Sequence, residues 1–271
     1  MRLKALLSAL TLAVCLTAGP AMAGSLIIKG STTVLPIAQK AAEDFMDQHP
    51  DIDISVAGGG SGNGIKALID GTCHIADASR FIKDKEVKMA VENGHYPVPF
   101  GVALDSIVPV VHPSNSVDGL SMDDLKAIYE GNIDNWKDVG GPDRPVVVVS
   151  RDTSSGTYEV WEDIVLQGDR VTPRAQLLAS NGAVAQAVAS NKNAVGYIGI
   201  GYLNDDLKNL TVDGVLGTPE TTASGEYPVS RYLYMFTDGW PTGETLMFIN
   251  FILHPDKGQK IVEEVGYVAK Y

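Results

Sequence analysis

The chain has 271 residues, of which 45% are hydrophobic and 20% are charged, and its formal net charge is −12. These proportions are those of a globular protein with enough material for a large core. Such an acidic chain is repelled by nucleic acid and by anionic membrane surfaces, so we expect neither as a partner.

The first residues have the pattern of an export signal. Arg2 and Lys4 supply positive charge, residues 5–18 are apolar, and Ala21-Met22-Ala23 fits the small-residue cleavage pattern. The apolar run is too short to span a membrane comfortably, so we do not expect an uncleaved anchor. We predict cleavage after Ala23 and a periplasmic protein.

Of the two cysteines, only Cys73 lies outside this signal, so the mature chain can form no intramolecular disulfide. Cys15 is a poor lipidation site, because Val14 before it is not a small residue. An exported protein without disulfides suits a bacterial envelope protein with a large core. We expect Cys73 to be a buried, inert thiol.

Strand-like apolar runs alternate with amphipathic helical stretches along the rest of the chain. The alternation predicts an α/β fold with mainly parallel sheets. Two apolar runs, around Val102–Val111 and Tyr227–Phe236, suit strands that cross between two lobes. The predicted elements are 25–29, 34–48, 52–56, 64–69, 73–78, 99–111, 122–129, 146–150, 158–166, 183–190, 194–200, 231–236, 245–253 and 257–265.

Three loops with small residues each follow a predicted strand and open a predicted helix. They are 30–36 (GSTTVLP), 58–64 (GGGSGNG) and 151–157 (RDTSSGT). Free backbone N–H groups and the helix dipole make such starts suitable for binding an anion. In the first loop we expect the hydroxyls of Thr32 and Thr33 at the cap of the helix, and a plain capped helix start is the alternative to an anion site there. A flexible hinge is the alternative for the second loop, and a surface arginine for the third.

Arginine side chains add charge to these loops. Arg151 offers a guanidinium fork that suits a tetrahedral oxyanion, beside the hydroxyls of Ser154, Ser155 and Thr157. Arg80 ends the strand 73–78, at a position where ligands bind in open α/β sheets. A solvated arginine is the alternative at Arg80.

An enzyme is the rival class, because the loops are rich in serine. At Ser61 the G-x-S-x-G pattern fails, since Asn63 stands where the last glycine should be. The five histidines lie in no recognisable catalytic motif and have no metal-ligand spacing. We therefore predict no catalytic residues, no metal and no cofactor, with a phosphate-ester hydrolase as the alternative.

The whole pattern resembles the phosphate-binding proteins of phosphate ABC transporters, among the type II periplasmic solute-binding proteins. The resemblance rests on stretches spread over the chain after the signal. These are 30–36, 58–66, 78–80, 129–141 (YEGNIDNWKDVGG), 151–157, 194–197 (AVGY) and 248–258. The RxxSSGT and GGGSGxGI elements are specific only in combination.

The resemblance implies inorganic phosphate bound between two closing lobes and passed to the permease subunits of a transporter. By that analogy lobe one is 24–104 with 231–271, lobe two is 105–230, and we expect a monomer. The expected ligand residues are Thr32, Thr33, Ser61, Arg80, Arg151, Ser155, Gly156 and Thr157. Sulfate, molybdate and tungstate remain alternative ligands.

One position departs from the best-known members, in which an aspartate follows the Ala-Ser pair and accepts a proton from the ligand. Arg80 stands there in this chain, as in one branch of the family. A site made of donors alone would hold sulfate as readily as phosphate, so another carboxylate has to accept the proton. Asp77, Asp105 and Asp152 are the candidates, and we favour Asp77.

Overall fold

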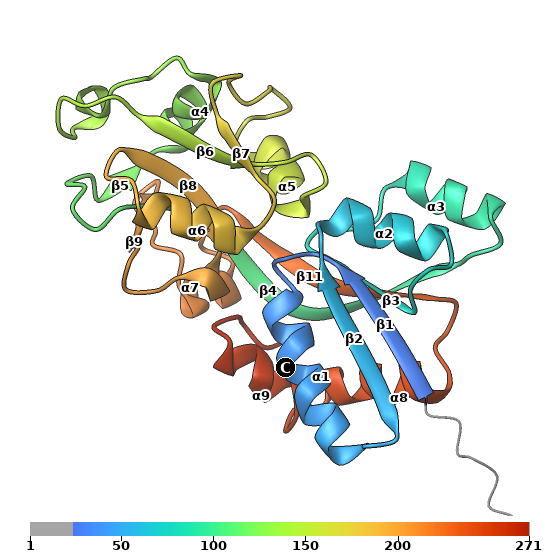
Figure 1. The fold of residues 1–271 in the computed structure, drawn as a ribbon. Coiled ribbons are helices and arrows are strands. Elements are labelled where there is room, and N and C mark those ends of the chain that lie inside the picture. Colours follow the sequence, from blue (N-terminus) through green and yellow to red (C-terminus); the bar gives the residue numbers. More distant parts are fainter. Residues whose placement is uncertain (1–23, 271) are drawn as a thin grey trace, which may run out of the picture.

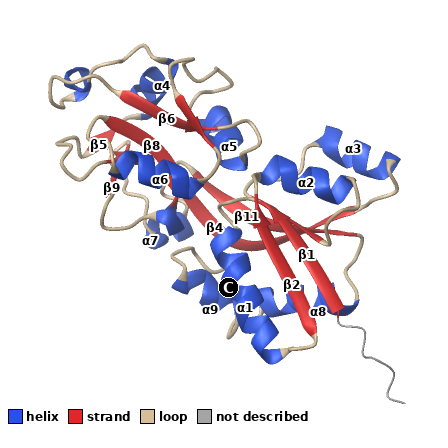
Figure 2. Ribbon diagram, in the orientation of Figure 1, coloured by secondary structure: helices blue, strands red, loops and turns tan. Residues whose placement is uncertain are grey.

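The computed structural model describes residues 24–270, and the predicted export signal lies outside the described residues. The chain folds into two α/β lobes joined by the crossing strands β4 (Pro97–Val111) and β11 (Ser230–Asp238), as Figures 1 and 2 show. The predicted α/β class and the two predicted crossing strands are therefore confirmed. Within residues 24–270, no helix is long and apolar enough to cross a membrane.

The helices are short, and most lie close to their predicted positions. They are α1 (Leu35–Gln48), α2 (Ser61–Ile69), α3 (Asp84–Glu92), α4 (Met122–Glu130), α5 (Gly156–Ile164), α6 (Asn181–Ala189), α7 (Pro219–Ser224), α8 (Gly243–Leu253) and α9 (Gly258–Glu264). Single 3-10 turns occur at η1 (Trp136–Val139) and η2 (Ile200–Tyr202).

The main sheet runs through both lobes in the order β2-β1-β3-β11-β4-β8-β6-β7, with β9 also paired to β4. The outer strands of each lobe pair in parallel, whereas β4 and β11 are antiparallel to their neighbours, so the sheet is mixed. The other strands are β1 (Gly24–Gly30), β2 (Ile52–Gly58), β3 (Ile75–Ala78), β5 (Gly119–Leu120), β6 (Val147–Arg151), β7 (Gln176–Leu178), β8 (Ala194–Gly199), β9 (Lys208–Asn209) and β10 (Thr211–Val212).

The lobes have separate cores. One core draws its buried residues from Ile107 to Val229, and its aromatic centre stacks Trp161 on Tyr197 with ring centroids 4.4 Å apart. The other two clusters come from segments before and after that stretch, except that Ile200 packs into the core under α1. Separate cores allow each lobe to move as a unit about the strands that cross between them.

Helix α3 was not predicted, and it buries little of its surface. Val87, Ala90 and Val91 recur at helical spacing, but only Ala90 is buried, while Val87, Met89 and Val91 are exposed. Its start is held instead by Glu86, whose Oε2 accepts a hydrogen bond from Lys83 N at 2.9 Å. Polar contacts therefore place this helix at the edge of lobe one.

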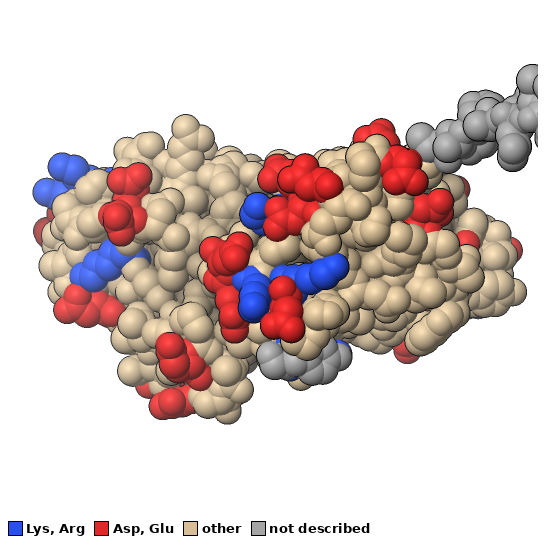
Figure 3. Space-filling model, turned by 90° about the horizontal axis from the view of Figure 1, so that it is seen from below, with Lys and Arg blue, Asp and Glu red and all other residues tan. Residues whose placement is uncertain are grey.

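The surface reflects the acidic composition. On the face seen from below, the few Lys and Arg side chains lie beside Asp and Glu side chains, and no broad basic area is visible there (Figure 3). Local donors inside the protein, rather than a basic field on this face, must therefore attract an anionic ligand.

Candidate anion-binding site

Four helix N-termini meet where the two lobes face each other. The first residue of α6, Asn181, donates from its backbone N to Thr32 Oγ1, just before α1, at 3.4 Å. Gly62 N, in the first turn of α2, donates to Ser154 O, just before α5, at 2.9 Å. Figure 1 shows these helix ends converging between the lobes. Each terminus brings the partial positive charge of its helix dipole to one place.

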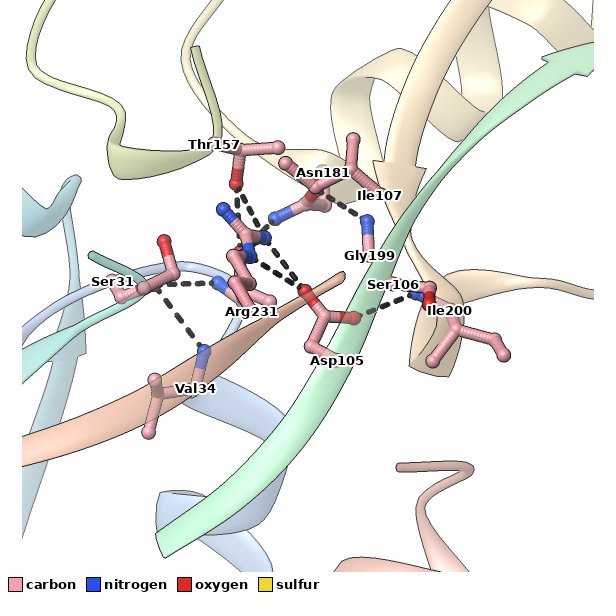
Figure 4. A network of polar contacts seen from close by, with 12 residues as sticks. Ser31, Val34, Asp105, Ser106, Ile107, Thr157, Asn181, Gly199, Ile200 and Arg231 are labelled. Atoms are coloured by element: carbon pink, nitrogen blue, oxygen red, sulfur yellow. Dashed lines mark hydrogen bonds and ion pairs between the residues drawn. The ribbon is translucent and has the colours of Figure 1, made fainter. Parts of the chain in front are cut away.

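The loop before α1 is capped differently from the prediction. The hydroxyl of Ser31, not those of Thr32 or Thr33, accepts from Thr33 N at 3.1 Å and Val34 N at 3.4 Å (Figure 4). The prediction that Thr32 and Thr33 cap the helix is therefore wrong. Their side chains face lobe two instead, and Thr33 Oγ1 lies 2.9 Å from Thr157 Oγ1.

The glycines of the second loop let the lobes approach closely. Gly60 has a φ of +97°, and a Cβ there would lie 2.5 Å from Ser154 Oγ of the other lobe. Only glycine fits such a conformation and contact. A Cβ on Gly156 would likewise collide with Ser61 Oγ, which accepts from Ser79 N at 3.0 Å.

Arg151 lies at the end of β6 and is almost entirely buried, with 1% exposure. Its Nε donates to Leu178 O at 3.1 Å, and its Nη2 donates to Ala179 O at 3.0 Å and to Thr32 Oγ1 at 3.3 Å. Among the described residues, its Nη1 is buried without a hydrogen-bond partner. A buried donor on a charged group without an acceptor is costly, so this atom calls for an anionic ligand.

A second buried arginine completes the site. Arg231 of β11 lies directly opposite Asp105 of β4, and its Nε and Nη2 donate to Asp105 Oδ2 at 2.9 and 2.7 Å. Its Nη2 also donates to Thr157 Oγ1 at 3.0 Å, and Figure 4 shows the guanidinium between Asp105 and Thr157. Its Nη1 is buried with no partner among residues 24–270.

The charges of this centre favour an anion. Burial lowers the pKa of Arg151, and the positive charge of Arg231 nearby acts in the same direction. Burial raises the pKa of Asp105, although Arg231 and the backbone N–H of Ile200 oppose that shift. Asp105 pairs with Arg231, whereas Arg151 forms no ion pair among residues 24–270, and a bound oxyanion would supply the missing negative charge.

Arg80 is held differently from the other two arginines. Its Nη1 and Nη2 donate to the two carboxylate oxygens of Glu86, both at 2.8 Å, and its Nε lies 2.9 Å from Glu159 Oε2. Its Nη1 also donates to Phe81 O at 3.0 Å. Burial opposes the charged form, but the hydrogen bonds and charges of the two glutamates outweigh it and raise the pKa of Arg80.

Comparison with known proteins gives the family. A family model described as PBP superfamily domain matches residues 17–256. The phosphate-binding protein PstS of Bacillus subtilis is 34% identical over 249 residues, which cover 90% of this chain and 80% of that protein. PstS of Staphylococcus aureus is also 34% identical, over 254 residues that cover 89% of this chain and 76% of that protein.

Similarity to solved structures supports the same family. A chain from Clostridium perfringens, described as a phosphate ABC transporter substrate-binding protein with bound phosphate, superposes with a TM-score of 0.85. It is 35% identical, and the match covers 92% of this chain and all of that one, 100%. An ABC-type phosphate transport receptor from Vibrio cholerae has a TM-score of 0.74 at 32% identity, covering 90% and 99%. This chain belongs to the family of phosphate-binding proteins. The family resemblance and the two-lobed type II fold are thereby confirmed.

In this phosphate-binding protein, the structure brings seven of the eight predicted ligand residues to the meeting point of the helices. The eighth, Arg80, has both amino groups hydrogen-bonded to Glu86 and Phe81 O, and its Nε forms an ion pair with Glu159 without a hydrogen bond. The seven are Thr32, Thr33, Ser61, Arg151, Ser155, Gly156 and Thr157.

The three candidate carboxylates of this family member have different surroundings. Asp105 is committed to Arg231 and Ile200 N, and Asp152 Oδ1 accepts from Ser154 N at 2.8 Å and from Ser154 Oγ. Asp77 is 1% exposed, and its Oδ1 has no hydrogen-bond partner among residues 24–270. Burial raises the pKa of Asp77 well above its ordinary value.

Two polar residues of the site were missed at the sequence level. Arg231 was assigned only to a crossing strand, although a lone arginine in an apolar run, with Asp105 in the other crossing strand, is a signal for a buried ion pair. Asn181 follows Ser180 at a small-residue helix start like the three that were recognised, and its Nδ2 donates to Thr33 Oγ1 at 3.0 Å. Over residues 24–270, no cluster of His, Cys, Asp and Glu could hold a metal ion.

Proposed function

We propose that this protein captures inorganic phosphate between its lobes and delivers it to the permease of an ABC transporter from the periplasm. The observation that carries the proposal is the pair of buried amino groups, Arg151 Nη1 and Arg231 Nη1, without acceptors in the described chain. The names of the relatives support phosphate as the anion that they bind.

The proposed ligand residues are the seven that meet at the helix N-termini, with Arg231 added. Hydroxyl groups of Ser61, Ser155 and Thr157 donate to oxygens of the ligand, and the two guanidinium groups carry its charge. Each hydrogen bond to a charged group contributes about 1.5–3 kcal/mol, so several of them can reach micromolar affinity after association costs.

Closure follows from where these residues lie. We assign lobe one to 24–104 and 231–271 and lobe two to 105–230, as the sequence predicted. Thr32 and Ser61 then belong to lobe one, and Arg151 and Thr157 to lobe two. A ligand that completes contacts on both sides favours the closed state through its differential affinity.

Selectivity against sulfate needs an acceptor for the proton of the ligand. We propose Asp77 for this role, because its Oδ1 has no competing donor in the described chain, whereas Asp105 and Asp152 are engaged. Register places Asp77 opposite Gly30 and Met235 in the sheet, next to the loop before α1.

The test is a calorimetric titration of the purified protein with phosphate, sulfate, molybdate and tungstate. Phosphate should bind most tightly, and small-angle scattering should show a smaller radius of gyration at saturation. Tighter binding of another oxyanion would replace phosphate by that ligand. A phosphatase assay on the same preparation checks the enzyme alternative, for which we expect no turnover.

A further inference from the structure

An ion-pair cluster lies at the rim of the site, where α3 and α5 face each other across the lobes. Its lobe-one part is prearranged, because Glu86 fixes both amino groups of Arg80 in a bidentate pair within the same lobe. This pair orients the remaining edge of the guanidinium, its Nε–H, toward lobe two. The orientation needs no ligand, since every group involved comes from residues 80–86.

The lobe-two part is a single carboxylate. Glu159 Oε2 lies 2.9 Å from Arg80 Nε and also contacts Lys83 Nζ. The side chains of Arg80 and Glu159 are only 7% and 12% exposed, so water screens their interaction weakly. Glu159 Oε2 is buried and has no hydrogen bond among residues 24–270 besides these ion pairs.

Charge is balanced only when the lobes are together. Arg80, Lys83 and Glu86 give lobe one a net charge of +1 at this point, and Glu159 gives lobe two −1. The cluster borders a cavity of about 600 Å³ between the lobes, lined also by Lys85 of lobe one and by Glu162 and Arg170 of lobe two. Opening the lobes would separate opposite charges that are partly shielded from water.

The cluster lies one or two residues along the chain from proposed ligand donors and their contacts. Arg80 directly follows Ser79, whose Oγ lies 3.2 Å from Ser61 Oγ. Glu159 lies two residues after Thr157 in the first turn of α5. Any movement that brings the start of α5 onto the ligand therefore also brings Glu159 onto Arg80.

We propose that Arg80 and Glu159 form an interlobe latch, which stabilises the closed state without touching the ligand. They are positioning residues: the latch raises the fraction of protein already closed and so tightens the apparent affinity. This assignment rests on the proposed function for its effect on phosphate binding, but not for its effect on closure. It also gives Arg80 a role other than the ligand contact that its place in the sequence suggested.

The first test needs no ligand. Spin labels on Lys88→Cys in α3 and Asp163→Cys in α5 would report the distance between the lobes; Cys73 stays unlabelled, because it is buried and burial raises the pKa of its thiol to about 12. Glu159→Gln should lengthen the mean distance in the empty protein, and high salt should shift the unsubstituted protein in the same direction. Glu162→Gln, one turn further along α5, is the matched control and should leave the distance unchanged. Equal distances in Glu159→Gln and the unsubstituted protein would overturn the latch.

The second test separates a latch from a ligand contact. If Arg80 positions the lobes, Glu159→Gln should weaken phosphate binding about five- to tenfold, mainly through faster dissociation. If Arg80 instead binds phosphate, removing the competing carboxylate should tighten binding. Tighter or unchanged binding in Glu159→Gln would therefore overturn the proposal. A protein that binds no phosphate at all would refute the proposed function, and the label distances would still decide on the latch.

Discussion

The centre of the cleft and its rim both contain buried arginines, yet the two regions treat them in opposite ways. At the centre, Asp105 pairs with Arg231 but not with Arg151, and each arginine keeps a buried amino group without a partner among residues 24–270. At the rim, Arg80 and Lys83 face two carboxylates: the amino groups of Arg80 are hydrogen-bonded to Glu86, and its Nε is in ion-pair contact with Glu159.

The difference teaches that the number of carboxylates, not the presence of arginine, marks a site for an anion. A cluster whose positive and negative charges are equal in number does not need an anionic ligand, and its ion pairs can instead stabilise the contact between the lobes. An unbalanced cluster that is buried needs the ligand to satisfy it. Substitutions in the two regions should therefore have different effects on phosphate affinity and on stability.

The largest effect should come from Arg231→Met, which leaves Asp105 buried without its partner. An uncompensated buried charge costs about 3–5 kcal/mol of folding stability. Urea denaturation would measure the loss, and phosphate affinity should fall as well. The double variant Arg231→Met with Asp105→Leu should regain most of the stability but not the affinity. If the double variant bound phosphate normally, Arg231 would have no part in the site.

Arg151→Ala should weaken phosphate binding by about 2 kcal/mol or more, because the buried anion loses a charged partner. Calorimetric titration measures this, with circular dichroism to show that the fold is intact. Arg144→Ala, an exposed arginine of the same lobe, is the control and should bind as the unsubstituted protein does. Unchanged affinity in the folded Arg151→Ala protein would contradict the assignment.

A smaller change is expected for selectivity. Asp77→Asn should reduce the preference for phosphate over sulfate by about 1–3 kcal/mol, since an amide can also donate to sulfate. Parallel titrations of both proteins with both anions at neutral pH give the ratio. An identical ratio would transfer the role of proton acceptor to Asp105 or Asp152, which would be substituted in the same way.

The smallest effect should be on the pH dependence of stability. Burial raises the pKa of Asp77 above its ordinary value of 3.8, so the folded state holds this proton at a pH where the unfolded state has lost it. The contribution of Asp77 to stability is therefore fully present below about pH 4 and decreases as pH rises toward the folded pKa. Asp77→Asn should remove that decrease. Denaturation of both proteins at several pH values, without ligand, would show two parallel curves if Asp77 did not titrate in this way.

Sequence reasoning succeeded where the signal was local. The loops 58–64 and 151–157 could be recognised because glycines, hydroxyls and an arginine stand next to one another before a helix. The same reasoning missed Arg231, since its partner Asp105 is 126 residues away and the pair forms only across two strands. It also could not foresee that Glu86 and Glu159 would occupy Arg80, because that requires knowing which helices face each other.

The prediction of helices and of their caps had the same limit, because it used only local signals. Helices α1 and α8 each bury several apolar residues, whereas α3 is held by polar contacts and buries only Ala90. The cap of α1 was assigned to the wrong hydroxyl, because three successive hydroxyl residues precede it and only the backbone conformation selects Ser31. Local composition therefore locates such a loop without fixing the role of each side chain.

The place of β11 in the sheet has a consequence for how the chain is made. This strand comes near the end of the sequence, yet it lies between β3 and β4, two strands from the first half. Until residues 230–238 have been synthesised, β3 keeps an unpaired edge, and long-range pairing of this kind is slow and prone to aggregation. The segment of lobe two is continuous and can fold earlier. A nascent chain would therefore carry one finished half beside an open sheet, and a truncated product would be a target for chaperones and proteases rather than a smaller working protein.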